Sequence, residues 1–249
     1  MSGVRTAVQV IDPGPPGPRV GRHTGFDAFE HAVLRCADAL SRTVGAEEEE
    51  VLFVLSGHGE LELDGERHAL EPEAGAHLIA GETYRLHPAG SLTVLAVRIP
   101  AARSGPRPQV VSRLGDQEAQ AATTDREFRI VADTPTATHF VGYIPTVRAP
   151  DHFHTYDEVI YVLDGVGVMH AQGRDLALAP GSVIQLPART VHCLENTGPS
   201  VMRVAAVFRP AGSPAAAYYP DGTPAYPGIP PAHPAPESAG ADSPPKEVV

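Results

Sequence analysis

An internal repeat constrains the fold of this chain more than any other feature. The segment EEVLFVLSGHGELELDG at residues 49–65 aligns without gaps with DEVIYVLDGVGVMHAQG at residues 157–173, which places Glu50 opposite Glu158. The similarity continues downstream with small changes of spacing that suit loop insertions. Such self-similarity predicts two consecutive copies of one structural unit.

Each copy contains short runs of β-branched and apolar residues separated by turns that carry Gly or Pro. The clearest runs are residues 51–55, 92–99, 159–163 and 201–208. Runs of this length between turn residues are typical of antiparallel strands in a sandwich or barrel. The chain also has 24 Gly and 26 Pro, which indicates many turns and few long helices. We therefore expect an all-β fold.

One segment has conflicting signals. DAFEHAVLRCADAL at residues 27–40 has good helix propensity, but the repeat aligns it with THFVGYIPTVRA at residues 138–149. The second segment contains Pro145 and several β-branched residues, which favour an extended chain. We follow the repeat and predict a strand at residues 29–38.

The repeat and the composition divide the 249 residues into five parts. These are an N-terminal arm (1–22), an N-terminal barrel (23–101), a polar linker with one possible helical turn (102–125), a C-terminal barrel (126–210) and a Pro-rich tail (211–249). A tail so rich in proline cannot fill ladder positions or bury a core, so we expect it to be partly disordered. Its segment AAAYYPDGTPAY is either solvated or packed on the barrel through its tyrosines.

Charge and composition exclude several classes of function. The formal net charge is −11, so the chain would repel a nucleic-acid backbone. No window is apolar enough for a membrane span, and the N-terminus has no apolar core of signal-peptide length, so we expect a cytoplasmic protein. Cys36 and Cys193 are too few for a disulfide framework and fit reduced thiols.

The segment DHFHTYDEVIYVLDG at residues 151–165 contains the candidate site. Side chains at positions i and i+2 of an extended strand point to one face, so His152 and His154 converge. Glu158 is at an even separation from both and can reach the same face. His192 begins a later strand that antiparallel pairing could bring beside them. Together these four residues could hold one cation.

This segment resembles the first conserved motif of the cupins. From its first histidine onward, the series His152-x-His154-x3-Glu158-x6-Gly165 fits the pattern H-x-H-x3,4-E-x6-G. The glycine that opens the cupin motif is displaced, because Gly142 lies three or four residues too early. This displacement suggests a longer loop before the histidines.

The second cupin motif, G-x5-P-x-G-x2-H-x3-N, is matched less strictly. Here it reads Pro187-x-Arg189-x2-His192-x3-Asn196. Arg189 replaces a turn glycine, and Gly181 lies one residue further from the proline than the motif requires. The histidine and the asparagine keep their spacing, so the chain resembles a cupin in both motifs.

The resemblance covers roughly residues 20–210 and implies a bicupin, with two tandem jelly-roll barrels of the double-stranded β-helix type. The residues that match the cupin metal ligands are His152, His154, Glu158 and His192. Three imidazoles and one carboxylate suit one divalent transition metal, namely Fe, Mn, Ni, Co, Cu or Zn, and disfavour Ca²⁺ and Mg²⁺.

The N-terminal copy lacks this ligand set. It keeps Glu50, but the three histidine positions hold Val44, Ala46 and Leu86. A lone carboxylate cannot hold a divalent cation in competition with water, so we expect this barrel to be metal-free. The alternative is a shifted site that uses His77 or His87.

The resemblance implies a metal-dependent enzyme acting on a small chelating substrate, most simply a dioxygenase-type oxidoreductase. The alternatives are a non-redox bicupin enzyme (a hydrolase similar to ureidoglycine aminohydrolase, an isomerase or a lyase) and a small-molecule-binding protein without turnover. Gln185 and His170, on strands flanking the predicted pocket, are candidate catalytic residues, with hydrogen-bonded structural roles as the alternative. Cys193 should point away from the pocket. The expected partners are a small-molecule substrate and a second copy in a homodimer, with neither nucleic acid nor membrane.

Overall fold

The computed structural model describes residues 9–11, 19–21, 29–101, 107, 109–123 and 125–226. Across these ranges the regular elements are strands, apart from the short 3-10 helix η1 (Leu114–Asp116). The prediction of an all-β fold is therefore confirmed. Within the same ranges, no helix has the length and apolar character needed to cross a membrane. The predicted disorder of the last residues of the chain falls outside this description.

The N-terminal barrel is built on two long, bent strands that pair with each other. Its elements are β3 (Glu30–Cys36), β4 (Leu40–Thr43), β5 (Glu48–Leu63), β6 (Glu66–Leu70), β7 (Ala74–Leu78) and β8 (Thr83–Pro100). The sheet order is β2-β3-β8-β5-β7-β9, with β4 also on β8 and β6 also on β5. The edge strands β2 (Arg19–Gly21) and β9 (Val111–Arg113) come from the segments that flank the barrel in the sequence.

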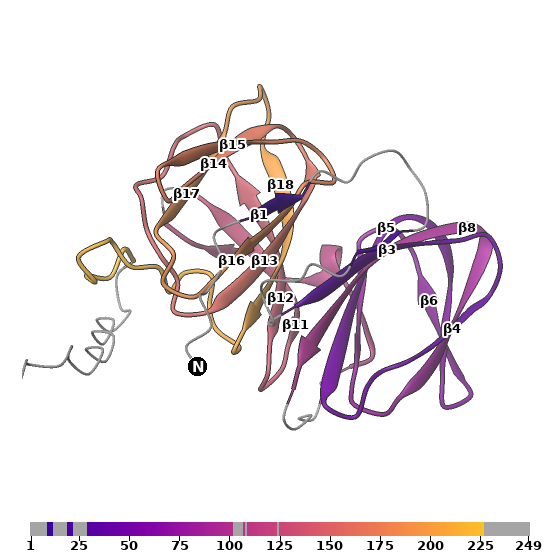
Figure 1. Ribbon diagram of the computed structural model, residues 1–249. Helices are drawn as coiled ribbons and strands as arrows, with labels where there is room; N and C mark the ends of the chain where they lie inside the picture. Colours follow the sequence, from indigo (N-terminus) through magenta and orange to yellow (C-terminus); the bar gives the residue numbers. More distant parts are fainter. Residues whose placement is uncertain are drawn as a thin grey trace, which may run out of the picture.

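The C-terminal barrel repeats this plan with shorter strands. Its elements are β11 (Glu127–Asp133), β12 (Thr138–Ile144), β13 (Asp157–Asp164), β14 (Gly167–Ala171), β15 (Arg174–Leu178), β16 (Val183–Leu186), β17 (His192–Asn196) and β18 (Met202–Arg209). One sheet has the order β1-β16-β13-β18-β12-β11-β10, and the other has the order β15-β14-β17. β1 (Gln9–Ile11) and β10 (Gln120–Ala121) are its outer strands. Figure 1 shows the two barrels side by side, with indigo β1 within the orange C-terminal barrel.

Strand pairing confirms the repeat. In the N-terminal barrel Glu50 lies opposite Leu78 on one side and Arg98 on the other. Glu158 lies opposite Leu186 and Phe208. The two glutamates therefore occupy equivalent places in two copies of one sheet.

The segment with conflicting signals is a strand, as the repeat predicted. β3 ends at Cys36, slightly before the expected end, and pairs antiparallel with β8. Ala32, Leu34 and Cys36 alternate into the N-terminal core, which a helix could not achieve. Burial within a sheet has overridden local helix propensity here.

Two glycines turn the chain at equivalent places in the repeat. Gly57 and Gly165 have φ angles of 83° and 85°, which L-residues with a side chain rarely adopt. A Cβ on Gly57 would lie 2.0 Å from the carbonyl oxygen of Ser91, and one on Gly165 would lie 2.8 Å from Met202. Both positions therefore need glycine for its φ and for its lack of a side chain.

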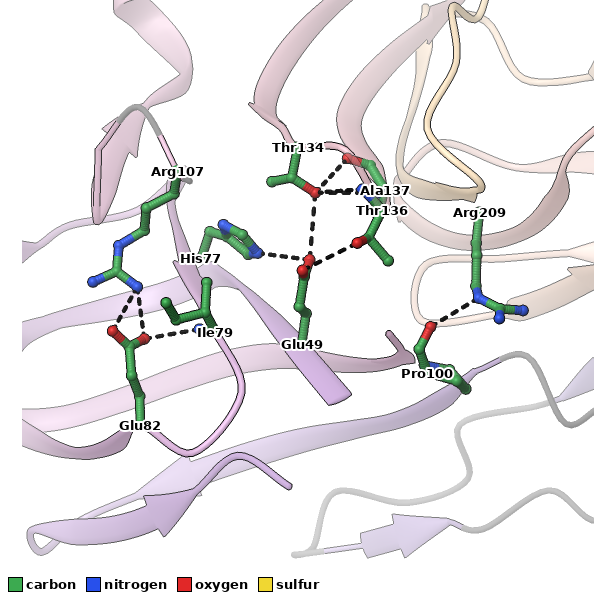
Figure 2. Close-up of polar contacts among 10 residues, drawn as sticks. All are labelled: Glu49, His77, Ile79, Glu82, Pro100, Arg107, Thr134, Thr136, Ala137 and Arg209. Atoms are coloured by element: carbon green, nitrogen blue, oxygen red, sulfur yellow. Dashed lines mark hydrogen bonds and ion pairs between the residues drawn. The ribbon is translucent and has the colours of Figure 1, made fainter. Parts of the chain in front are cut away.

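A third apolar cluster joins the two barrels. Phe53 and Val97 of the N-terminal barrel pack with Val141 and Val207 of the C-terminal barrel. At its edge the buried carboxylate of Glu49 accepts hydrogen bonds that cross between the barrels (Figure 2). The donors from the C-terminal barrel are the Thr134 hydroxyl at 3.3 Å and the Thr136 hydroxyl at 3.1 Å. His77 Nε2, in the same barrel as Glu49, lies 3.0 Å from the carboxylate.

Candidate metal centre

Three histidines converge inside the C-terminal barrel. His192 opens β17 and forms an antiparallel bridge with His152, with backbone hydrogen bonds of 3.0 and 2.8 Å. His154 lies two residues beyond His152 on the same face, as the extended backbone dictates. Each of the three offers one ring nitrogen, and these nitrogens all lie within 4.8 Å of one another. The structure thus brings together the three histidines that the sequence singled out.

Hydrogen bonding orients all three rings in the same way. Each Nδ1 lies close to a backbone carbonyl, which can only accept a hydrogen bond. These contacts are His152 to Pro150 at 3.0 Å, His154 to Ala216 at 3.1 Å and His192 to Thr190 at 2.8 Å. Each Nδ1 must therefore carry the proton, which leaves the lone pair on Nε2 free for a ligand bond. This donor set fits a divalent transition metal.

Burial keeps these imidazoles neutral. His152, His154 and His192 are each less than a tenth exposed. Desolvation is the main cause that lowers the pKa of His154 to about 3, and the neighbouring His152 lowers it further. Burial and the neighbouring histidines likewise place the pKa of His192 well below its usual range. Neutral imidazole is the form that binds a metal ion, so protons compete weakly for this site.

Glu158 faces the same cavity from β13. Its side chain is buried, and desolvation raises the pKa of the carboxyl to about 8. A nearby cation would offset this cost and favour the carboxylate. The carboxylate of Glu158 lies outside the cluster formed by the ring nitrogens of the three histidines, which are all within 4.8 Å of one another. It lines the cavity beside the three histidines.

The cavity itself is small, with a volume of about 80 Å³. Since one water needs about 10–15 Å³ on this measure, the space suits a few non-hydrogen atoms. Its walls are largely apolar and include Phe128, Phe140, Ile160 and Phe208. The site can therefore exclude bulk water around a small bound molecule.

Arg126 adds a positive charge to this cavity. Its side chain is buried and lines the cavity, and it donates from one terminal nitrogen to the carbonyl of Leu194. Its Nε is buried without a hydrogen-bond partner among the residues described. Desolvation lowers the pKa of Arg126, but a guanidinium keeps its proton at neutral pH. A small anion would complete its hydrogen bonding.

Comparison with known proteins identifies this half of the chain. Residues 139–208, which contain all three histidines and Glu158, match the cupin domain family. The C-terminal barrel is a cupin domain. No curated protein is detectably similar to the chain in sequence.

Solved bicupin structures share the fold over most of the chain. A protein of Pseudomonas aeruginosa described as glyoxylate-induced superposes with a TM-score of 0.62 at 17% identity, over 80% of this chain and 78% of that chain. Oxalate decarboxylase of Bacillus subtilis, a protein with Mn(II) centres, gives a TM-score of 0.61 at 14% identity, over 75% and 70%. A further structure of oxalate decarboxylase, which concerns its substrate binding mode, gives 0.62 at 14%, over the same shares. The chain therefore has the bicupin fold.

Neither predicted catalytic residue of the cupin domain lies at the cavity. On β16, Ile184 and Leu186 point into the core of the barrel, so the intervening Gln185 points outward, toward the layer between the barrels. Its Nε2 is buried without a partner in the described part of the chain. We assign Gln185 no role at the metal centre.

His170 also lies on the outer face of its strand. Met169 and Ala171 fill the core, and His170 points the other way. It bonds to Asp175 at 2.7 Å and to Glu195 at 2.6 Å, and these carboxylates raise its pKa against the opposing effect of burial. This arrangement is a surface ion pair, so we assign His170 no role at the metal centre either.

The N-terminal barrel has filled the equivalent space. Val44 and Leu86, at two of the histidine positions, are fully buried in its apolar core. Ala46, at the third, is exposed. Glu50 accepts hydrogen bonds from Arg42 at 2.6 Å and from Tyr84 at 2.9 Å. A guanidinium thus neutralises the carboxylate that matches Glu158.

The histidines of the alternative N-terminal site lie apart. His77 contacts Glu49 in the layer between the barrels, whereas His87 contacts Glu62 at 2.7 Å on a half-exposed hairpin. Over the ranges that the structure describes, the group in the cupin domain is the one cluster whose donors could share an ion.

Two participants in the site escaped sequence reasoning. Arg126 is the first residue of the predicted C-terminal barrel and belongs to neither motif. Ala216 contributes only its backbone carbonyl, which leaves no trace in the identity of the residue. The tail tyrosines did indicate a contact with the barrel, which was one of the two alternatives for the tail. Tyr218 is buried in the structure.

Proposed function

We propose that the chain is a metal-dependent bicupin enzyme that acts on a small, chelating, anionic substrate in its C-terminal barrel. The observation that carries this proposal is the shared orientation of His152, His154 and His192. All three Nε2 atoms are free to bind one ion because all three Nδ1 atoms are committed to carbonyls. We assign Glu158, the buried carboxyl at the same cavity, as the fourth ligand.

The donor set suits Fe, Mn, Ni, Co, Cu or Zn. A bound ion of this kind supplies Lewis-acid polarisation of substrate oxygens and, if redox-active, access to dioxygen chemistry. The Mn(II) centres of the structurally similar oxalate decarboxylase make manganese a natural first choice for reconstitution.

The residues around the site define the substrate class. The formal charges of a divalent ion, Arg126 and Glu158 leave an excess of positive charge, which favours an anion. The cavity of about 80 Å³ favours a few-atom ligand over a bulky phenol or flavonol. A small carboxylate such as an α-keto, α-hydroxy or dicarboxylic acid satisfies both conditions, because it can chelate the ion and pair with Arg126. The names of the two structural neighbours, which mention glyoxylate and oxalate, point to the same size class.

Two reaction types fit this substrate class. In a dioxygenase-type oxidation, a redox-active ion held by the three histidines would supply the dioxygen chemistry, and the cavity would exclude water. A decarboxylation with no net oxidation breaks the C–C bond of the acid, releases carbon dioxide and places a proton on the carbon that keeps the electron pair. The shared fold with oxalate decarboxylases favours this second candidate. In both reactions, Arg126 holds the carboxylate and the apolar walls exclude solvent.

Three measurements on the purified protein test the proposal. Elemental analysis should find about one transition-metal ion per chain, and a His152→Ala/His154→Ala double variant should have lost it. Oxygen uptake with small keto, hydroxy and dicarboxylic acids identifies a dioxygenase, whereas release of carbon dioxide without oxygen uptake identifies a decarboxylase. A double variant that keeps its full metal content contradicts the site. Absence of turnover with any such acid contradicts the enzymatic role.

A further inference from the structure

The part of the tail that the structure describes lies against the metal-binding barrel. We define residues 211–226 as the tail strap; in Figure 1 it is the orange-yellow segment beside the C-terminal barrel. Ala217 and Tyr218, in the middle of the strap, are 1% and 6% exposed. A segment with buried side chains is packed on the barrel. It follows the last strand, β18, and belongs to neither sheet.

Phe153, between the two histidines of the first motif, anchors the strap. Tyr218 exchanges two backbone hydrogen bonds with it, at 2.8 and 2.9 Å, in an isolated antiparallel bridge. Their rings stack with centroids 5.6 Å apart and an interplanar angle of 25°. The strap is therefore joined directly to the residue that separates His152 from His154.

A second anchor lies at the start of the strap. The Gly212 N–H donates to the Thr138 hydroxyl at 3.0 Å, and the Gly212 Cα lies tightly against Tyr156. A Cβ at this position would lie 2.0 Å from Cζ of the Tyr156 ring. The strap then closes on itself through a hydrogen bond of 2.8 Å from the Ala225 N–H to the Ala217 carbonyl. These contacts fix its path on the barrel.

Between the anchors, the strap reaches the metal centre in two ways. The carbonyl of Ala216 accepts the hydrogen bond from His154 Nδ1. Pro214 and Ala217 form part of the cavity wall. The other two histidines differ from His154, because His152 and His192 each bond to the carbonyl two residues before them in their own segments. His154 alone among the three depends on a distant part of the chain for its orientation.

We propose that the tail strap is a positioning element of the metal centre, which fixes the tautomer and ring orientation of His154 and closes one wall of the cavity. This inference rests on the proposed metal-binding function. The carbonyl of Ala216 holds the proton on Nδ1 and so presents the Nε2 lone pair to the ion. A strap that detaches both releases this ring and opens the cavity to solvent. The strap therefore controls metal affinity and the rate of metal release.

Substitution of Tyr218 tests this role, and the next residue in the chain provides a matched control. Tyr218→Ala removes the ring that stacks on Phe153, whereas Tyr219→Ala makes the same change at a side chain that is 37% exposed. Tyr218→Phe keeps the stacked ring and serves as the conservative variant. The probe is Co²⁺, titrated into metal-free full-length protein against a competing chelator and followed by its visible absorption. Chelator-driven release of bound Co²⁺ gives the off-rate.

We expect Tyr218→Ala to bind Co²⁺ about tenfold to a hundredfold more weakly than the parent protein, the range found when an outer partner of a metal-bound histidine is lost. Release should be faster by a similar factor. Tyr219→Ala and Tyr218→Phe should both match the parent. A Tyr218→Ala variant with parental affinity and release rate overturns the strap proposal while the metal site stands. A parent protein that does not bind Co²⁺ overturns both proposals.

A second pair of variants covers the case in which Tyr218→Ala does not fold. Gly212→Val displaces the strap by collision with Tyr156, whereas Gly115→Val alters a glycine outside the strap that has no left-handed φ and whose Cβ would meet nothing within 4 Å. Weaker Co²⁺ binding by the first variant alone supports the proposal, and equal binding by the two contradicts it.

Discussion

In the N-terminal barrel, Arg42 and Glu50 form a partly buried ion pair at the place equivalent to the candidate metal centre of the C-terminal barrel. Arg42 Nη2 lies 2.6 Å from Glu50 Oε1, and the Glu50 side chain is fully buried. Glu158, its counterpart in the repeat, lies beside three imidazoles in a cavity whose guanidinium, that of Arg126, bonds to the carbonyl of Leu194. The two barrels thus surround equivalent carboxylates differently, one with a side-chain cation and the other with three imidazoles that could hold a metal ion.

Removing Arg42 should destabilise the N-terminal barrel. Arg42→Met leaves Glu50 buried with the Tyr84 hydroxyl and a longer contact to Arg98 at 3.4 Å. Loss of one partner of a buried ion pair costs about 3 kcal/mol of unfolding free energy, which urea denaturation can measure. Arg67→Met provides the control, since its pair with Glu60 is about half exposed and should contribute less than about 1 kcal/mol. Equal losses for the two variants would falsify this account of Glu50.

Replacing Arg126 should weaken anion binding without loss of metal. Arg126→Gln keeps a polar side chain at the cavity but removes a charge-assisted hydrogen bond worth roughly 1.5–3 kcal/mol. Binding of oxalate, as a small-carboxylate probe, to the metal-loaded protein should therefore weaken about tenfold or more by calorimetry. Arg129→Gln, on the same strand region but bonded to the carbonyl of Gln117, should bind oxalate like the parent. Loss of metal by Arg126→Gln, or unchanged oxalate affinity, argues against its assigned role.

The histidine buried between the barrels should make stability sensitive to acid. Desolvation, aided by the neighbouring His77, lowers the pKa of His139 to about 3. Between this value and the unfolded pKa of about 6.5, the unfolded chain binds a proton that the folded chain does not. The unfolding free energy therefore falls as the pH falls through this window, by up to about 1.4 kcal/mol per pH unit for this one group.

Substitution of His139 isolates that contribution. In His139→Phe the ring remains beside Phe53, whose centroid is 5.7 Å from the histidine ring, but it cannot titrate. The slope of unfolding free energy against pH, measured by urea denaturation of metal-free protein from about pH 6 to 4, should decrease by about one proton. A parental slope in His139→Phe rules out this source of acid sensitivity.

The turn glycines of the repeat should tolerate substitution unequally. Gly57 and Gly65 have nearly the same φ, 83° and 82°, so alanine at either position adopts the same unfavourable backbone conformation, at about 1–2 kcal/mol. Only at Gly57 does the new Cβ meet a backbone oxygen, that of Ser91. Gly57→Ala should therefore lose about 1–3 kcal/mol more unfolding free energy than Gly65→Ala. Equal losses in urea denaturation would mean that the chain relaxes around the added methyl group.

The fold and the three histidines of the site could be predicted from the sequence because both depend on residue spacing. The repeat determined the strand pairing around Glu50 and Glu158, and it predicted β3 as a strand against local propensity. The spacing of His152 and His154 placed both on one face of the chain. His192 followed from the second motif, and the structure brings its ring to the other two.

The surroundings of the site were harder to predict from the sequence. Gln185 and His170 were predicted because their strands flank the cavity, but strand alternation turns both side chains outward. The inward face of each strand is identified only by neighbours in the core, such as Ile184 and Met169. Arg126 reaches the cavity through tertiary packing from outside the motifs. The contact between His154 and Ala216 spans much of the C-terminal half and uses a backbone atom, so no residue pattern encodes it.

The pairing of β1 with β16 has a consequence for how this molecule is made. Residues 9–11 are synthesised long before residues 183–185, yet their backbone hydrogen bonds are with those residues. Strand β1 can therefore pair only after the residues of β16 in the second barrel have been synthesised. A fragment cut at the linker would leave β16 with a bare sheet edge, the kind of edge through which proteins aggregate. The two halves repeat each other in sequence, but the sheet of the second barrel includes a strand from the start of the chain.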